Sequence, residues 1–293
     1  RATDSVIIAR RWYGYWLVGT TDTPWHGDKS QPVAEAGDVD YLLDNLNAYL
    51  ERKVGRADVL GTFAGLRPLL KSVGATDSTS ALLRDHAVID GPPGLTTVVG
   101  AKTPPSRRMA ADAVDAAVRP LGVNTASPTA SLPLVGAGDW AAVRDSAGDL
   151  ARHFGMGIGD AGRLLQRHGD RVRDLRALAR GRPALCARLP GASHYLAAEL
   201  VHAADAGGAH TLTDVMTRRT HLSIELADGG LALAPFVAGC IAPYLGWSSD
   251  DTRRQLAAYR ELIAAERAAL GPGAAVPLAA SPAAAPVPLA AAL

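Results

Sequence analysis

Residues 95–118 constrain the fold most, because they read as a strand, a tight turn and a helix in direct succession. The β-branched run at 95–99 predicts the strand. Thr103 and Pro104 stand where a helix N-cap and a first helical residue belong, and a missing N–H costs nothing there. A small-residue turn of this kind can bring a polar or anionic ligand against backbone N–H groups, although many such turns bind nothing.

Hydrophobic periodicity predicts the remaining elements. Residues 38–50 repeat leucine at helical spacing behind Asp38, a typical N-cap. Beyond residue 139 the patterns are almost entirely helical. The expected strands are 6–9, 15–20, 59–64, 84–89 and 95–99, and the expected helices are 38–50, 140–154, 161–168, 171–179, 194–206, 212–219, 231–245 and 250–269.

Composition excludes several classes of protein. The 293 residues carry a net charge of +1, which argues against a general nucleic-acid binder, and 48% hydrophobic residues suffice for a sizeable core. Cys186 and Cys240 lack metal-ligand spacing, so we expect no metal site and a reduced, intracellular protein. The uncharged run 229–249 is interrupted by proline and glycine and predicts a buried helix rather than a membrane span.

Two segments read as connections rather than as packed structure. Residues 122–138 are rich in proline, serine and glycine and predict a linker and a domain boundary. Residues 271–293 form an alanine and proline tail without periodicity, which we expect to be disordered. The predicted class is α+β, with the strands concentrated before the linker and the helices after it.

Several motifs together resemble one known family. YWLVGTTDTPW at 15–25 is followed by VLGTFAGLRPLL at 59–70 and LLRDHAVI at 82–89, and then by the turn at 100–103. This order is similar to that of the FAD-dependent, quinone-linked glycerol-3-phosphate dehydrogenases, as found in bacteria. DVMTRRTHLSIE at 214–225 and the helix at 241–267 extend the resemblance to about residue 270.

The resemblance implies an architecture. Residues 1–121 would be the closing part of an FAD-dependent oxidoreductase domain, with a mixed sheet from the C-terminal part of an FAD/NAD(P)-binding flavoprotein. Residues 139–270 would be the family's all-α C-terminal domain. The chain starts at Arg1 without a convincing dinucleotide fingerprint, so we expect a fragment that does not bind FAD tightly alone.

The resemblance also implies an activity. The reaction would be oxidation of sn-glycerol 3-phosphate to dihydroxyacetone phosphate, with FAD taking the hydride and a quinone as the final acceptor. A cytoplasmic enzyme is expected, and peripheral attachment to the inner face of the membrane and a homodimer stay open. Residues 144–188 hold an excess of arginine over aspartate, which we interpret as a solvated face rather than a membrane-binding one.

Three basic residues are the candidate catalytic and substrate-binding groups. Spacing alone favours exposed or structurally paired side chains for Arg67, Arg84 and Lys102. The resemblance implies instead that all three bind substrate and that Arg67 and Lys102 are catalytic, with Arg67 over the flavin. The guanidinium group of arginine binds phosphate oxygens through paired N–H donors, and a cation stabilises the negative charge of a developing alkoxide.

The resemblance assigns flavin contacts to Gly65, Gly100, Ala101, Lys102 and Thr103. One departure from the family bears on this site. Where the family has two threonines after the lysine and leucine of its turn, this chain has a Pro-Pro pair directly after Thr103. Hydroxyl and N–H donors at the helix start are therefore lost, and this reduces the expected cofactor affinity or activity.

Other candidate residues have simpler interpretations. The Gly136-Ala137-Gly138 sequence matches part of a dinucleotide fingerprint, but no strand precedes it, so it is not taken as one. His86 is interpreted as structural. For Asp22, a turn-stabilising role is favoured over one in orienting the site.

Two alternatives to the dehydrogenase remain. The chain could be an inactive, degenerate or truncated remnant whose helical domain serves packing or protein association, as the Pro-Pro pair suggests. A weaker alternative is a related flavin oxidase that passes electrons to oxygen.

Overall fold

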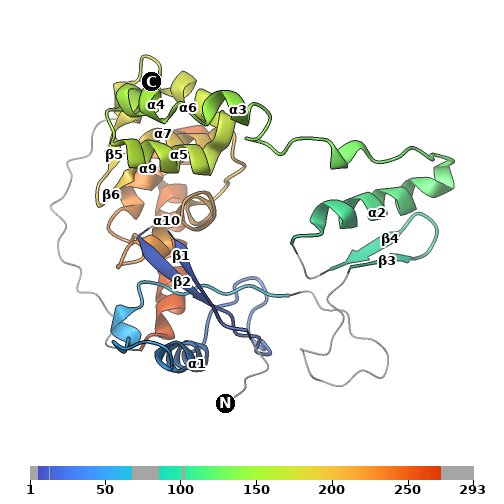
Figure 1. Ribbon diagram of the computed structural model, residues 1–293, viewed down its shortest axis with the longest axis horizontal. Helices are drawn as coiled ribbons and strands as arrows, with labels where there is room; N and C mark the ends of the chain where they lie inside the picture. The colour runs from blue at the N-terminus through green and yellow to red at the C-terminus, as the bar shows by residue number, and fades with distance from the viewer. Residues whose placement is uncertain (1–5, 13, 68–85, 101–102, 272–293) are drawn as a thin grey trace. The chain divides into compact units, whose positions relative to one another are not determined.

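The computed structural model describes residues 6–12, 14–67, 86–100 and 103–271. The chain is α+β, as expected, and its C-terminal part is helical (Figure 1). The elements in chain order are β1 (Ile8–Trp12), β2 (Tyr15–Gly19), α1 (Ala36–Asn47), β3 (Ala87–Asp90), β4 (Thr96–Val99), α2 (Ser106–Val118), α3 (Trp140–Val143), α4 (Ala147–Phe154), α5 (Ile158–His168), α6 (Val172–Ala179), β5 (Arg188–Leu189), β6 (Ala192–Leu196), α7 (Ala197–Asp205), a π-helix (Asp214–Arg219), α8 (Leu222–Glu225), α9 (Ala234–Leu245) and α10 (Ser249–Ala268).

The chain forms two compact units. The first comprises Arg1–Gly19, Val33–Phe63 and Leu134–Leu293, and the second Thr20–Pro32 and Ala64–Pro133. Contacts thus group the N-terminal hairpin and α1 with the helical part of the chain. The boundaries 121 and 138, which we expect between functional parts, stay predictions.

Helices α4 to α9 build the core of the first unit. Helix α7 packs against α6 and α9, and its Leu200 and Val201 are completely buried. Apolar residues lie on nearly every side of α7, which is typical of a helix enclosed by others. Helix α9 is likewise mostly buried, as predicted from the uncharged run 229–249. Among the described residues, no helix is both long and apolar enough to cross a membrane.

The β1–β2 hairpin is anchored to the helical part of the same unit. Its strands pair antiparallel, with Trp12 opposite Tyr15. The indole Nε1 of Trp12 donates to Glu225 Oε1 over 3.3 Å, and its ring lies edge-on to that of His221, with 5.0 Å between centroids. The strands predicted at 6–9 and 15–20 are confirmed and form a hairpin, and the first strand begins two residues later than predicted.

The segment 59–64, predicted as a strand, is not one. It runs extended along α10, where Thr62 Oγ1 donates to the carbonyl of Glu266 over 2.8 Å and Arg267 Nη1 donates to the carbonyl of Leu60 over 3.3 Å. Hydrogen bonds to a helix end thus take the place of a strand partner. A Cβ on Gly61 would lie 3.2 Å from Ile224 Cα, so this glycine permits a close backbone approach.

In the second unit, β3 and β4 pair antiparallel and α2 packs on them (Figure 1). Pro92, Gly94 and Leu95 make the connecting turn, in which Gly94 has φ of 87°. Helix α2 ends as predicted before Pro120, and Gly122 follows with φ of 72°. No residue of α2 is fully buried, and among the described elements its main packing partner is this two-stranded hairpin.

Two expectations about the strands need correction. In place of a mixed sheet, the strands that the structure describes form three separate two-stranded antiparallel sheets. Short turns can join antiparallel neighbours, whereas parallel pairs need long crossovers. In addition, the predicted helix 194–206 is divided: Ala192–Leu196 is β6, paired with β5, and only Ala197–Asp205 is helical.

Candidate active site

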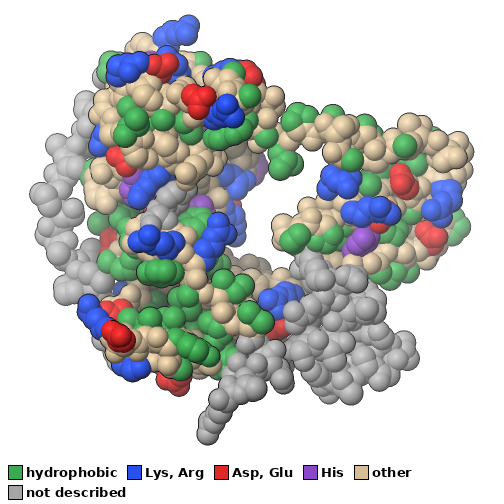
Figure 2. All heavy atoms as spheres, viewed as in Figure 1, with side chains coloured by type: hydrophobic (Ala, Val, Ile, Leu, Met, Phe, Trp, Pro, Cys, Tyr) green, Lys and Arg blue, Asp and Glu red, His purple; other side chains and the backbone are tan. Residues whose placement is uncertain are grey.

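Four of the seven predicted site residues lie in the described part of the second unit: Gly65, Arg67, Gly100 and Thr103. Arg84, Ala101 and Lys102 lie outside the described residues. On the face in Figure 2, basic, acidic and histidine side chains gather over the elements α2, β3 and β4 of this unit. No hydrogen bond or ion pair among the described residues joins Arg67 to the turn at 100–103.

Arg67 is held by a carboxylate from another motif. Its Nη1 donates to Asp22 Oδ2 over 2.6 Å, and the side chains of Arg67 and Asp22 are 36% and 25% exposed. Both residues lie in segments without helix or strand. From the sequence we expected Asp22 to stabilise a turn. Its ion pair with Arg67 was not predicted.

The two glycines of the predicted cofactor site differ in their surroundings. A Cβ on Gly100 would collide with Met109 Sδ and lie 3.0 Å from His86 Cβ, so this glycine lets the end of β4 pack against the start of α2. A Cβ on Gly65 would meet no atom within 4 Å. Internal packing therefore explains Gly100 and leaves Gly65 with one open face.

Thr103 does not cap α2, in contrast to the prediction. The helix begins at Ser106, and the N-cap is Pro105, which has no side-chain cap bond. The carbonyl of Thr103 instead accepts from the N–H of Ser106 over 3.0 Å, closing a turn before the helix. Pro104 and Pro105 lie in this turn, so the helix starts two residues later than the Thr-Pro pattern indicates.

The described part of this unit also contains a His–Asp–Arg cluster that the sequence did not reveal. His86 Nε2 lies 2.7 Å from Asp112 Oδ2, and Arg108 Nε donates to Asp112 Oδ1 over 2.8 Å. The hydrogen bonds with His86 and Arg108 lower the pKa of the Asp112 carboxyl below its usual value. The i,i+4 spacing of Arg108 and Asp112 was the available signal, whereas His86 pairs across the fold.

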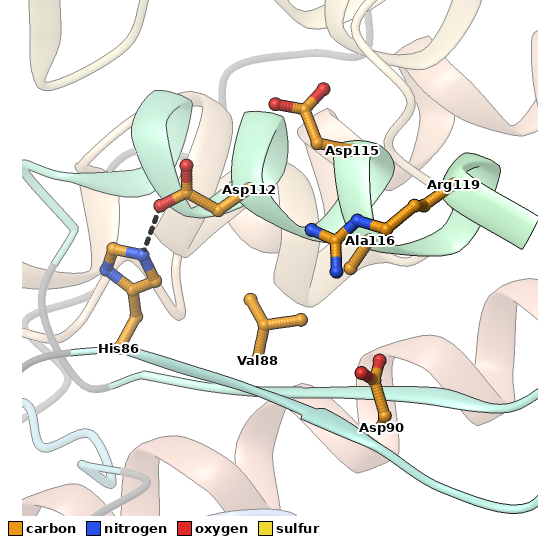
Figure 3. A pocket seen from close by; sticks show the side chains of 7 residues that line it. All are labelled: His86, Val88, Asp90, Asp112, Asp115, Ala116 and Arg119. Atoms are coloured by element: carbon orange, nitrogen blue, oxygen red, sulfur yellow. Dashed lines mark hydrogen bonds and ion pairs between the residues drawn. The ribbon is translucent and has the colours of Figure 1, made fainter. Parts of the chain in front are cut away.

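A pocket of about 400 Å³ lies between this hairpin and α2 (Figure 3). Asp90 reaches it from β3, Asp112 and Asp115 from α2, and Arg119 from the turn after α2. Three aspartates thus line the pocket with one arginine and one histidine, although the Asp115 carboxylate points away from the hairpin in Figure 3. This balance of charge repels an anion. The lining residues are His86, Val88, Asp90, Asp112, Asp115, Ala116 and Arg119.

Two buried carboxylates in the first unit are fully occupied by neighbours. Glu199 accepts from Arg167 Nε over 2.8 Å and Nη2 over 3.0 Å, and it pairs with His168 over 2.8 Å. Burial alone would raise the pKa of Glu199, but the hydrogen bond from His168 and the charge of Arg167 hold it below its usual value. Glu225 similarly pairs with His194 over 2.8 Å. Saturated pairs of this kind are structural.

The glycine pair at 136 and 138 also has a structural role. Gly136 has φ of 90°, and its carbonyl accepts from the N–H of Asp170 over 2.8 Å. A Cβ on Gly169 would collide with that carbonyl, so the two glycines let the backbones touch. As expected, no strand lies directly before Gly136, so the region lacks the strand–turn–helix form of a dinucleotide site.

Comparisons with known proteins agree along the chain. The family of the C-terminal domain of alpha-glycerophosphate oxidase matches residues 127–252. Glycerol-3-phosphate dehydrogenase 2 of Mycobacterium tuberculosis (strain H37Rv) is 39% identical over 267 residues, which cover 91% of this chain and 45% of the relative. The mitochondrial glycerol-3-phosphate dehydrogenase of Mus musculus is 30% identical over 258 residues, which cover 86% of this chain and 35% of the relative. The chain thus spans less than half the length of these curated relatives.

A solved structure resembles the fold. It is the X-ray structure of the glycerol-3-phosphate dehydrogenase from Bacillus halodurans complexed with FAD, with a TM-score of 0.74. The match has 23% sequence identity and covers 91% of this chain and 51% of that one. Together with the relatives above, it agrees with the resemblance found in the motifs: the chain matches the C-terminal portion of FAD-dependent glycerol-3-phosphate dehydrogenases.

Proposed function

We propose that the chain is part of an enzyme that oxidises sn-glycerol 3-phosphate to dihydroxyacetone phosphate with FAD and passes the electrons to a quinone. The observation that carries the proposal is the 39% identity to a mycobacterial glycerol-3-phosphate dehydrogenase across 91% of the chain. The oxidation removes a hydride from the secondary carbon and a proton from its hydroxyl group, and the quinone leaves as quinol.

The described residues are compatible with a flavin. Gly65 has an open face where a flat ring could approach the backbone, and α2 has no acidic residue in its first turn, so its N-terminal end favours electron-rich groups. Gly65, Gly100, Ala101, Lys102 and Thr103 are the proposed cofactor contacts. The flavin, when bound, would supply the hydride acceptor.

Arg67 is the proposed catalytic cation within the described residues. Its guanidinium group would donate to the oxygen that loses its proton, or to the phosphate, and would stabilise the negative charge there. Lys102 is proposed to act with it, and Arg84 to bind substrate. The acidic pocket beside α2 is unsuited to a phosphate, so we do not place the substrate there.

An inactive flavoprotein remnant is the second candidate function. The observation in its favour is the start of α2, where the N-cap is Pro105 and no side chain caps the helix. Proline also removes N–H donors from this turn. In that case the first unit would serve packing or protein association.

The proposal extends to partners and location. Glycerol 3-phosphate and a quinone are the proposed substrates, and the proposed location is the cytoplasm, while peripheral attachment to the membrane and a homodimer stay open.

The test is dye-linked oxidation of glycerol 3-phosphate, together with flavin absorbance, on the full-length gene product. Arg67→Ala should lower kcat by about 10²–10³-fold, as removal of a donor to a developing oxyanion does. Arg144→Ala is the matched control, because Arg144 is an exposed arginine that pairs with its neighbour Asp145. Its activity should equal that of the unmodified enzyme.

Three results would contradict the proposal in different ways. Bound flavin without turnover in the unmodified protein would support the remnant. Rapid oxygen consumption without added acceptor would indicate an oxidase. Full activity in Arg67→Ala would remove Arg67 from the site.

A further inference from the structure

The ion pair between Asp22 and Arg67 connects two loop segments that are far apart in the sequence. Neither residue lies in a helix or strand, and they are 45 positions apart in the sequence. A long, partly exposed arginine on a loop samples many rotamers, and a short charge-assisted hydrogen bond reduces that freedom. The 2.6 Å contact with Asp22 therefore determines where the guanidinium group points.

The contact with Asp22 uses one nitrogen of the Arg67 guanidinium group. Only Nη1 of Arg67 bonds to a described residue, which leaves the edge formed by Nε and Nη2 available. That edge presents two parallel N–H donors, the arrangement that binds phosphate or carboxylate oxygens in pairs.

Two other arginines of the chain are bound differently, although Arg218 meets Asp214 through Nη1 alone, as Arg67 meets Asp22. Arg56 uses Nε and Nη2 on Asp40, and Nη1 on the carbonyl of Ala269. Arg167 places Nε and Nη2 on Glu199. In both cases the two-donor edge is already occupied, whereas no described residue occupies this edge of Arg67. A carboxylate that orients an arginine while leaving this edge open suits a residue that must bind another anion.

We propose that Asp22 is a positioning residue for Arg67: it holds the guanidinium group by Nη1 so that the Nε–Nη2 edge meets the oxygens of an oxidisable phosphorylated alcohol. This inference rests on the proposed function, since it requires Arg67 to act on the substrate. Asp22 itself does not touch the substrate.

The experiment is a double-mutant cycle on the full-length gene product in the dye-linked assay, with Asp22→Asn, Arg67→Ala and the double variant. Asp22→Asn keeps the shape and an acceptor oxygen but loses the charge. It should lower kcat by roughly 10–100-fold, since misplacement of a catalytic group by about 1 Å has an effect of that order. In the Arg67→Ala background the same change should have no further effect.

The matched control is Asp40→Asn, which removes the charge from another exposed Arg–Asp pair, with a 2.7 Å contact. Its kcat should match that of the unmodified enzyme, and its melting temperature should match that of Asp22→Asn. Asp22→Glu restores the carboxylate and should recover part of the activity even if Asp22→Asn folds poorly.

Two results would overturn the inference while the proposed function stands. The first is an inactive Arg67→Ala with an Asp22→Asn that behaves like Asp40→Asn. The second is an equal effect of Asp22→Asn with and without Arg67, which would show that Asp22 acts independently. Full activity in Arg67→Ala would instead refute the role of Arg67 in the proposed function.

Discussion

The carboxyl group of Glu266 offers a test of how side chains on α10 are packed. Its side chain is half-buried on this helix, and no hydrogen bond to the carboxyl group forms among the described residues. Burial raises the pKa of Glu266 from 4.5 to about 7, and the positive charge of Arg218 offsets only part of this effect. The folded protein therefore holds this proton at a pH where the unfolded chain has lost it.

The size of the effect follows from the two pKa values. As pH rises from 4.5 to about 7, the unfolded chain releases the proton and the folded chain keeps it, so the free energy of unfolding falls. A pKa difference of this size corresponds to at most about 3 kcal/mol. Because the side chain is partly exposed, solvent screening reduces the expected effect to about 1–2 kcal/mol.

Glu266→Gln removes the titrating group but keeps the shape. Urea unfolding followed by circular dichroism between pH 4 and 8 should show that the variant gains about 1–2 kcal/mol relative to the unmodified protein as pH rises. Glu261→Gln, at an exposed position of the same helix, should show no such gain. If the Glu266→Gln curve stays parallel to that of the unmodified protein across this range, the reasoning about burial is refuted.

The remaining predictions concern the first unit and use the same unfolding assay. Gly169→Ala should cost about 2 kcal/mol or more, because Gly169 combines φ of 56° with ψ of −134° and its Cβ would strike the carbonyl of Gly136. Gly181→Ala has positive φ but no atom within 4 Å, so it should cost less, and equal losses would contradict the role of the close approach. Glu199→Ala should cost about 3–5 kcal/mol, since it leaves Arg167 buried without its carboxylate. A loss below about 1 kcal/mol would show that water replaces the pair.

Local patterns predicted the elements whose stability is largely local. Helix α10 follows from its periodicity and begins at the capping box of Ser248 and Asp251. The β1–β2 hairpin follows from two strands joined by a short turn. In these elements the strongest signals lie within a few residues of each other.

The incorrect predictions of secondary structure arise where residues distant in the sequence decide the conformation. The segment 59–64 has strand-like composition, but its hydrogen-bond partners are a helix end and a side chain more than 200 residues away. The last three residues of β6 were predicted as the start of a helix, because the apolar residues of β6 continue directly into α7. Periodicity cannot distinguish these cases.

The candidate site was predicted as a set of motifs rather than as a set of contacts. The sequence singled out Arg67 and Asp22 separately, but not their ion pair. Asp112 was not singled out, since its partner His86 comes from another element. Thr103 was assigned to a cap that Pro105 occupies, because two consecutive prolines allow a turn before the helix.

The anchoring of β1 by Glu225 has a consequence for the order of events during synthesis. Trp12 and Glu225 are 213 residues apart, as are Arg56 and the carbonyl of Ala269 that it contacts. The β1–β2 hairpin can form early, but its docking site exists only once residues 221–225 have left the ribosome. Contacts of such high sequence separation slow folding. The first unit should therefore complete its packing only after synthesis of its C-terminal helices.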